Sequence, residues 1–149
     1  SLLQLMLKEE YFNKPNPKST GPDFFNLEWV KNTIDKNGEE VKPEDLQSTL
    51  LELTVMSLTK ELKSLGVISD GLYFCGGGIH NKSLMKRIEK ELGFRILTTA
   101  DIGVDPDYLE ATSFAWFAAQ RIKGRKFDLS KVTGSNRKVF LGVITEPAI

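Results

Sequence analysis

Residues 71–99 constrain the fold more than any other part of the chain. An apolar run at 71–75 leads into Gly76, Gly77 and Gly78, and Asn81 then precedes an amphipathic pattern at 82–92. Gly93 ends that pattern, and a second β-prone run follows at 94–99. A buried strand, a helix and another strand joined by short connections predict a parallel βαβ unit with a right-handed crossover. We therefore expect an α/β protein.

Helical patterns flank this unit. Residues 2–11 are consistent with the end of a helix, and residues 20–23 predict the start of an amphipathic helix that ends at Gly38. The longest helix is expected from 42–45 to Gly66, and its two apolar stripes predict cover on more than one side. Residues 105–107 begin a predicted helix that runs to about Lys123 with a small-residue face. The last β-prone run is 138–144.

Composition excludes several classes of protein. The 149 residues are 40% hydrophobic and 27% charged, which predicts one ordered domain, and a chain of this length is expected to bury roughly 70% of its unfolded surface. Basic and acidic residues both total 20, so no net field attracts nucleic acid or anionic lipid. A single cysteine and the absence of a long apolar run favour a soluble protein of a reducing compartment. The opening residues, without an initiator Met or a secretion signal, suggest a piece cut from a longer protein.

The three consecutive glycines carry the strongest chemical signal. Backbone without Cβ atoms lets a ligand approach closely, and its position between a strand and a helix suits a nucleotide. The segment has neither the Lys-Ser/Thr of a P-loop nor the spacing of the GxGxxG fingerprint. On physical grounds alone, a tight turn that requires positive φ is an equal alternative.

Histidine and cysteine give weaker signals. His80 is the only histidine, so a metal site is not indicated, and an exposed or hydrogen-bonded side chain is favoured over a catalytic one. Cys75 ends an apolar strand and is interpreted as a small structural hydrophobe. Lys18 and Ser19 could present an ammonium and a hydroxyl to a phosphate, but the local pattern favours a simple lead into the following helix.

Glu110 is harder to explain as a surface residue. Together with Asp105 and Asp107 it places acids near a helix start, where they complement the helix dipole. The Ala-rich aromatic run that follows is expected to be packed, and a carboxylate entering a packed region needs a partner. A hydroxyl-bearing ligand such as a sugar and a neighbouring arginine are the two candidates.

Spaced motifs along nearly the whole chain, in the same order, resemble one family. They are residues 17–21 with Phe25 and Asn26, residues 45–54, residues 75–78 with Asn81, Leu84 and Met85, residues 98–103, Glu110 with residues 114–116, and residues 132–134 with 141–142. Together these motifs resemble the C-terminal part of the anhydro-N-acetylmuramic acid kinase family, a member of the actin/hexokinase/Hsp70 fold group.

The resemblance implies a fold and a reaction. Residues 1–149 would be a single domain, the C-terminal portion of a longer two-domain kinase with an actin/hexokinase-like (ribonuclease H-like) ATPase fold and a small, mainly parallel sheet flanked by helices. The kinase would use ATP and Mg²⁺ to open the 1,6-anhydro ring hydrolytically and form N-acetylmuramic acid 6-phosphate in peptidoglycan recycling. It implies a cytoplasmic enzyme that binds an amino sugar and ATP, not nucleic acid or membrane; a homodimer is possible.

The resemblance also assigns site residues. Gly76, Gly77, Gly78 and Asn81 match the adenosine side, Glu110 matches a sugar contact, and Lys18 and Ser19 match a motif near the nucleotide. Ile79 and His80 stand where many relatives have Ala-Arg, which leaves those side chains without an assigned role. The aspartate base and phosphate loops of the family have no counterpart here, so no catalytic or metal-binding residue is expected and the chain alone should be inactive. Another sugar or glycerol-type kinase of the fold group, and a non-catalytic nucleotide-binding module, are the alternatives.

Overall fold

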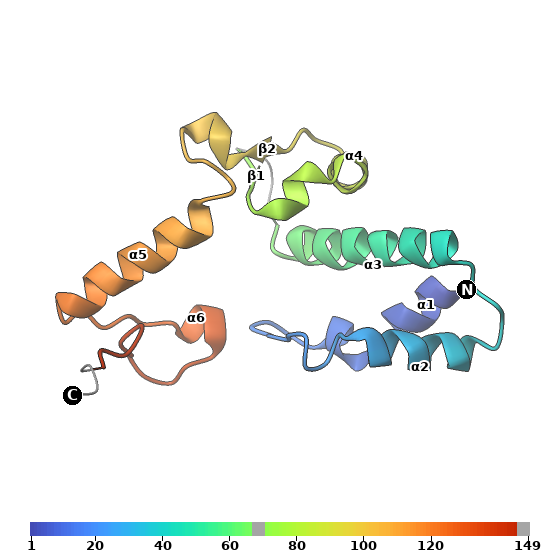
Figure 1. Cartoon of the computed structure of the whole chain (residues 1–149), viewed down its shortest axis with the longest axis horizontal. Helices are drawn as coiled ribbons and strands as arrows, with labels where there is room; N and C mark the ends of the chain where they lie inside the picture. Colours follow the sequence, from blue (N-terminus) through green and yellow to red (C-terminus); the bar gives the residue numbers. More distant parts are fainter. Residues whose placement is uncertain (67–70, 146–149) are drawn as a thin grey trace.

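The computed structural model describes residues 1–66 and 71–145. Figure 1 shows its elements, whose bounds are α1 Leu2–Leu7, η1 Glu10–Asn13, α2 Leu27–Asn37, α3 Pro43–Ser64, β1 Tyr73–Phe74, η2 Gly77–His80, α4 Lys82–Leu92, β2 Leu97–Thr98, η3 Thr99–Ile102, α5 Leu109–Ile122 and α6 Ser130–Thr133. The elements labelled η are 3₁₀ helices. No helix in the described ranges has the length and apolar character to cross a membrane.

The long helix α3 organises the first two thirds of the chain. Pro43 occupies its first turn, and Gly66, with φ of +64°, follows its end. One face of α3 buries Leu53 against Leu2 and Met6 of α1, with α2 packed alongside. The opposite face buries Val55 in a second core beside α4 and the strands. The prediction that this helix is covered on more than one side is confirmed.

The second core contains the predicted βαβ unit. The two strands pair in parallel, with Tyr73 opposite Leu97, and α4 between them contributes the buried Ile88. The side chain of Asn81 caps α4 by accepting a hydrogen bond from the Leu84 N–H at 3.0 Å. Tyr73 is 39% exposed, so β1 is not the buried strand we expected. With only two strands in the described sheet, each keeps an open edge.

Two predicted helix starts are wrong. Helix α2 begins at Leu27 and not at residues 20–23, because the Asn26 side chain caps the Trp29 N–H at 2.9 Å and the residues before it form turns. Helix α5 begins at Leu109 and not at residues 105–107. There the Asp105 carboxylate accepts the Asp107 N–H at 2.9 Å, which closes a local turn instead of a helical one.

The predicted C-terminal strand at 138–144 is also wrong. In the described part of the chain it makes a single antiparallel bridge, in which Phe127 and Val139 exchange backbone hydrogen bonds of 2.8 and 2.9 Å. A strand requires a neighbour along its length, and no further strand lies beside this run in residues 71–145.

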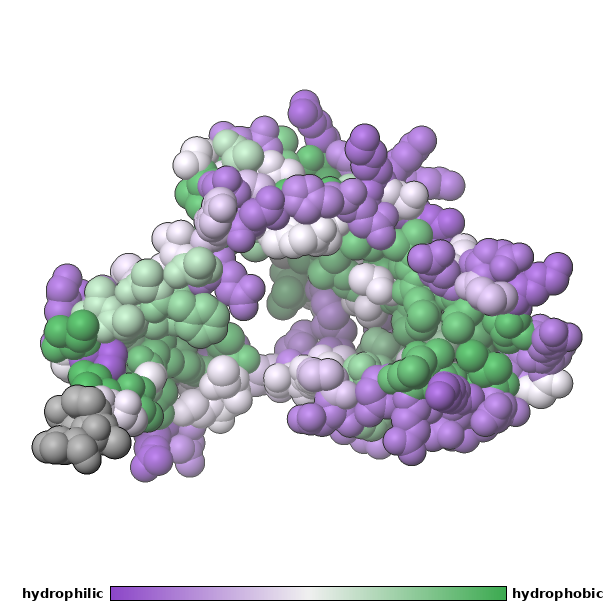
Figure 2. Space-filling view, viewed as in Figure 1, coloured by the Kyte–Doolittle hydropathy of each residue, from purple (hydrophilic) through white to green (hydrophobic). Residues whose placement is uncertain are grey.

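Helix α5 and the residues after it leave much apolar surface uncovered. Figure 1 shows α5 leading away from α3 and α4, and Figure 2 shows apolar side chains gathered over it. Phe114 is 63% exposed and Ile122 77%, and Ala115 is also exposed, so the expected packing of this helix is absent from the described chain. The accessible surface is 11246 Å² for 16.7 kDa, whereas a closed fold of this mass exposes about 7,600 Å². The prediction that the chain buries roughly 70% of its unfolded surface is therefore wrong, although two buried clusters are present.

Candidate functional site

The glycine segment joins β1 to α4 and contains glycines of two kinds. Gly76 has φ of +78°, and its N–H donates a hydrogen bond to the Pro106 carbonyl at 2.9 Å. Gly77 and Gly78 do not have positive φ. A Cβ at Gly77 would meet no atom within 4 Å, and one at Gly78 would make only an ordinary contact, at 3.8 Å from Leu84 Cδ2. The turn alternative thus accounts for Gly76, while the described fold gives no steric reason for the other two.

A groove of about 680 Å³ begins where the glycine segment enters α4. It lies between the first half of α3 and the start of α4, and its size falls within the range of small-molecule sites. Both polar and aliphatic side chains line it, among them Glu44, Gln47, Ser48, Leu51, Asn81, Leu84 and Arg87. The groove therefore offers hydrogen-bonding groups beside apolar surface at the end of the glycine segment.

Sequence reasoning found Asn81 but missed the α3 side of this groove. Leu51 follows Gln47 by four residues and Ser48 by three, which places both polar side chains next to it on the helix surface. The motif at 45–54 contains this signal, but the sequence analysis uses it only for the long helix and for the family resemblance and assigns it no place in a site. Arg87 also lines the groove and forms an ion pair with Glu52 of α3, which joins the two helices beside it.

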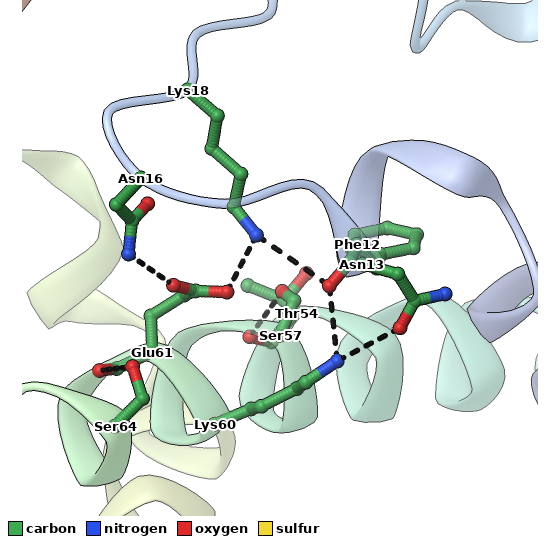
Figure 3. Close-up of polar contacts among 9 residues, drawn as sticks. All are labelled: Phe12, Asn13, Asn16, Lys18, Thr54, Ser57, Lys60, Glu61 and Ser64. Atoms are coloured by element: carbon green, nitrogen blue, oxygen red, sulfur yellow. Dashed lines mark hydrogen bonds and ion pairs between the residues drawn. The ribbon is translucent and has the colours of Figure 1, made fainter.

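Lys18 lies elsewhere, against the second half of α3 (Figure 3). Its Nζ is 2.6 Å from Oε1 of Glu61, whose Oε2 accepts a hydrogen bond of 2.8 Å from Asn16. These two hydrogen bonds, that of Lys18 above all, lower the pKa of Glu61 below its ordinary value. The Lys18 side chain is only 10% exposed. Ser19 is exposed, and neither residue is among those that line the groove.

Glu110 lies in the first turn of α5 and is exposed. Three residues before it, the Asp107 carboxylate accepts from Nε2 of His80, with distances of 2.8 Å to Oδ1 and 3.1 Å to Oδ2. The expectation that His80 is exposed or hydrogen-bonded is confirmed. Cys75 is exposed, so its interpretation as a small core residue is wrong: the chain leaves the core where β1 ends.

The acidic residues of the described chain do not form a metal centre. No cluster of three or more His, Cys, Asp or Glu side chains in residues 1–66 and 71–145 is arranged to hold an ion. These residues do not fit the Mg²⁺ that the resemblance implies, and no chemical step through a metal is assigned to them.

Comparisons with known proteins converge on one family. The family model described as "Anhydro-N-acetylmuramic acid kinase" matches residues 1–147. Curated relatives of that name include one from Coxiella burnetii (strain RSA 493 / Nine Mile phase I), which is 42% identical over 146 residues covering 96% of this chain and 38% of the relative. Another, from Pseudomonas syringae pv. syringae (strain B728a), is 43% identical over 145 residues, with 97% and 40% covered. The chain thus spans about two fifths of the length of these relatives.

Proposed function

Because the chain belongs to the anhydro-N-acetylmuramic acid kinase family, a family of the sugar-kinase and actin-like ATPase fold, we propose that it is the C-terminal portion of a longer two-domain kinase. That kinase transfers the γ-phosphoryl group of ATP to the anhydro sugar. The observation that carries this proposal is the family match over nearly the whole chain, at 42% identity to relatives that extend well beyond it.

In the reaction we propose, water adds at C1 and the bond from C1 to O6 breaks. The freed O6 takes the γ-phosphoryl group, ADP leaves, and the product is N-acetylmuramic acid 6-phosphate, an intermediate of peptidoglycan recycling in the cytoplasm. Phosphoryl transfer of this kind depends on holding the two substrates in line. We propose that this chain holds the substrates in place. The carboxylate base and the phosphate loops would belong to the rest of the kinase.

The glycine segment and the groove form the adenosine side of the proposed site. No atom of the described fold crowds the position of a Cβ at Gly77 or Gly78. A ligand therefore has space to lie against the backbone of these two residues. In the groove, Leu51 and Leu84 offer apolar contact to a base, while Gln47, Ser48 and Asn81 offer polar groups to its edge or to the ribose.

The other site residues take distinct roles. Glu110 is an exposed carboxylate that can accept hydrogen bonds from the hydroxyl or amide groups of the sugar. Ser19 is exposed and is the residue of its loop that we place near the nucleotide phosphates. Lys18 acts indirectly, because its contact with Glu61 holds that loop against α3.

The uncovered surface of α5 supports a larger assembly. Phe114, Trp116 and Ile122 are 48–77% exposed, and exposed apolar patches of this kind mark surfaces that pack against a partner. We propose that the remainder of the kinase covers this face. Self-association through the same face, in a homodimer, is the competing arrangement.

A chimeric kinase tests the proposal. The chain replaces the matching two fifths of the Pseudomonas syringae relative, and ADP release is measured with the anhydro sugar, with N-acetylmuramic acid and with glycerol. We expect ADP release with the anhydro sugar and none above background with the other two. A folded chimera that responds best to glycerol or to the open sugar would contradict the substrate assignment. One that binds ATP without turnover on any of them would support a non-catalytic nucleotide-binding module instead.

A further inference from the structure

Two contacts, one at each end of η2, connect the glycine segment to the loop before α5. At the first end the Gly76 N–H donates to the Pro106 carbonyl at 2.9 Å. At the second end His80 Nε2 donates to the Asp107 carboxylate at 2.8 Å. Neighbouring residues of one loop are thus bound to both ends of the segment that we place beside the nucleotide.

The same loop is rigidly joined to the start of α5. The Asp105 side chain accepts the Asp107 N–H at 2.9 Å, and the Asp105 carbonyl accepts the Tyr108 N–H at 3.2 Å. The Thr112 N–H then bonds to the Tyr108 carbonyl at 2.9 Å, which begins the helix. Glu110 lies in that first turn. A series of hydrogen bonds therefore runs from the glycine segment to Tyr108 and Thr112, in the helical turn that contains Glu110.

Within the described chain this connection matters because α5 has no extensive contact with another helix or strand. Figure 1 shows α5 leading away from α3 and α4, and most of its length is exposed within the described chain. The orientation of Glu110 relative to the glycine segment thus depends on the loop and its two contacts. Pro106 contributes through its backbone, which leaves His80 and Asp107 as the side chains that make the connection.

We propose that His80 and Asp107 are positioning residues of the kinase. Their pair fixes the distance between the nucleotide-side glycines and the sugar-side Glu110. The inference rests on the proposed function, which places a substrate at each end of the connection. Misplacement of a positioned group by about 1 Å can cost on the order of 100-fold in rate, so a connection of this kind affects turnover more than binding.

The pair is poorly placed to act merely as a stabilising contact. The side chains of His80 and Asp107 are 63% and 52% exposed, and polar contacts this exposed contribute little to folding stability, even between charged groups. A guanidinium can also donate charge-assisted hydrogen bonds to a carboxylate. The replacement His80→Arg is therefore a conservative variant that should retain the connection.

Kinetics of the chimeric kinase give one test. We expect His80→Ala to lower kcat by about tenfold through loss of orientation, with the Kd for ATP unchanged, and His80→Arg to restore kcat to near the starting value. Lys36→Ala, which removes an exposed charge on α2, serves as the control and should change neither quantity. Unchanged kcat in His80→Ala, or failure of the arginine variant to restore it, would overturn the proposal.

A distance measurement tests the connection independently of catalysis. In a Cys75→Ser background, spin labels at Lys90→Cys on α4 and Thr112→Cys on α5 report how firmly the two helices are held in the 149-residue chain. We expect His80→Ala to broaden the distance distribution and His80→Arg to narrow it again. An unchanged distribution would overturn the connection even if the chimera is active. If His80→Ala broadens the distribution but the unmodified chimera is inactive, the connection is supported and the proposed function is wrong.

Discussion

Gly76 and Gly77 are adjacent glycines with different physical reasons for being there. Gly76 has φ of +78° and ψ of 174°, a region that is essentially restricted to glycine and costs a residue with a Cβ about 1–3 kcal/mol. Gly77 has no such φ and open space around it. Alanine substitutions at the two positions therefore test the two reasons separately: Gly76→Ala tests the turn, and Gly77→Ala tests the proposed nucleotide contact.

We expect Gly76→Ala to lower the free energy of unfolding by about 1–3 kcal/mol. Gly77→Ala should leave that free energy nearly unchanged and weaken ATP binding by the chimeric kinase, because its Cβ enters the space we assign to the nucleotide. Urea denaturation and calorimetric titration measure the two effects. Equal ATP affinity in a folded Gly77→Ala variant would remove this residue from the site.

Glu110 is tested by an isosteric change. Glu110→Gln keeps the shape of the side chain and removes its charge, and hydrogen bonds to charged groups are stronger than neutral ones by about 1 kcal/mol or more. We expect KM for the anhydro sugar to rise roughly fivefold or more, with the Kd for ATP unchanged. Asp23→Asn, an exposed acid far along the chain, is the matched control. Unchanged sugar kinetics in Glu110→Gln would exclude the assigned contact.

At the scale of elements, the loop at 14–20 is held to α3 by an ion pair that depends on pH. The pKa of Glu61 is lowered in the folded state, chiefly by its hydrogen bond from Lys18. A lowered folded-state pKa contributes stability that is present above the ordinary glutamate pKa of about 4.3 and is lost as pH falls through the folded value. Acid should therefore weaken this attachment.

We expect Lys18→Met to flatten the pH dependence of the unfolding free energy below about pH 5, because the pKa of Glu61 then lies closer to its unfolded value, with the Asn16 hydrogen bond still lowering it. Lys14→Met is the control, since Lys14 forms a looser pair with Glu10 at 3.5 Å and its side chain is 52% exposed. Urea denaturation from pH 3 to pH 7 provides the measurement. A Lys18→Met variant whose pH dependence matches that of the unmodified chain would show that the pair contributes nothing.

The elements with strong local end signals were predicted well from sequence. Pro43 and Gly66 mark the two ends of α3, and Gly76 and Gly93 bound the segment between the strands. The start of α2 was missed because the Asn26 cap competes with the earlier Pro22 signal. Pairing between distant segments has no local signature, which is why the run at 138–144 was predicted as a strand and why the α3 side of the groove was not anticipated.

At the scale of the whole molecule, the exposed face of α5 is the main feature to explain. Its apolar residues, together with Leu141 and Val143, line a groove of about 670 Å³. If the rest of the kinase covers this face, the 149-residue chain should bind a hydrophobic dye strongly and the chimera should not. The paired change Phe114→Ser and Ile122→Ser should reduce dye binding by the chain.

The control for this experiment is Leu27→Ser, which removes a 67% exposed leucine from α2 and should leave dye binding unchanged. Strong dye binding by the folded chimera would show that the remainder of the kinase does not cover α5. A chimera that is a dimer with low dye binding, and that becomes a monomer when Phe114 and Ile122 are changed to serine, would instead assign the face to self-association.

The proposed reaction is tested most directly by the mass of the product that the chimeric kinase makes in ¹⁸O-labelled water. We expect a sugar that has gained one phosphoryl group and one water, with the label in the opened ring and ADP formed in equal amount. A phosphorylated sugar that retains the anhydro ring, or no phosphorylated sugar from a folded chimera that binds ATP, would contradict it.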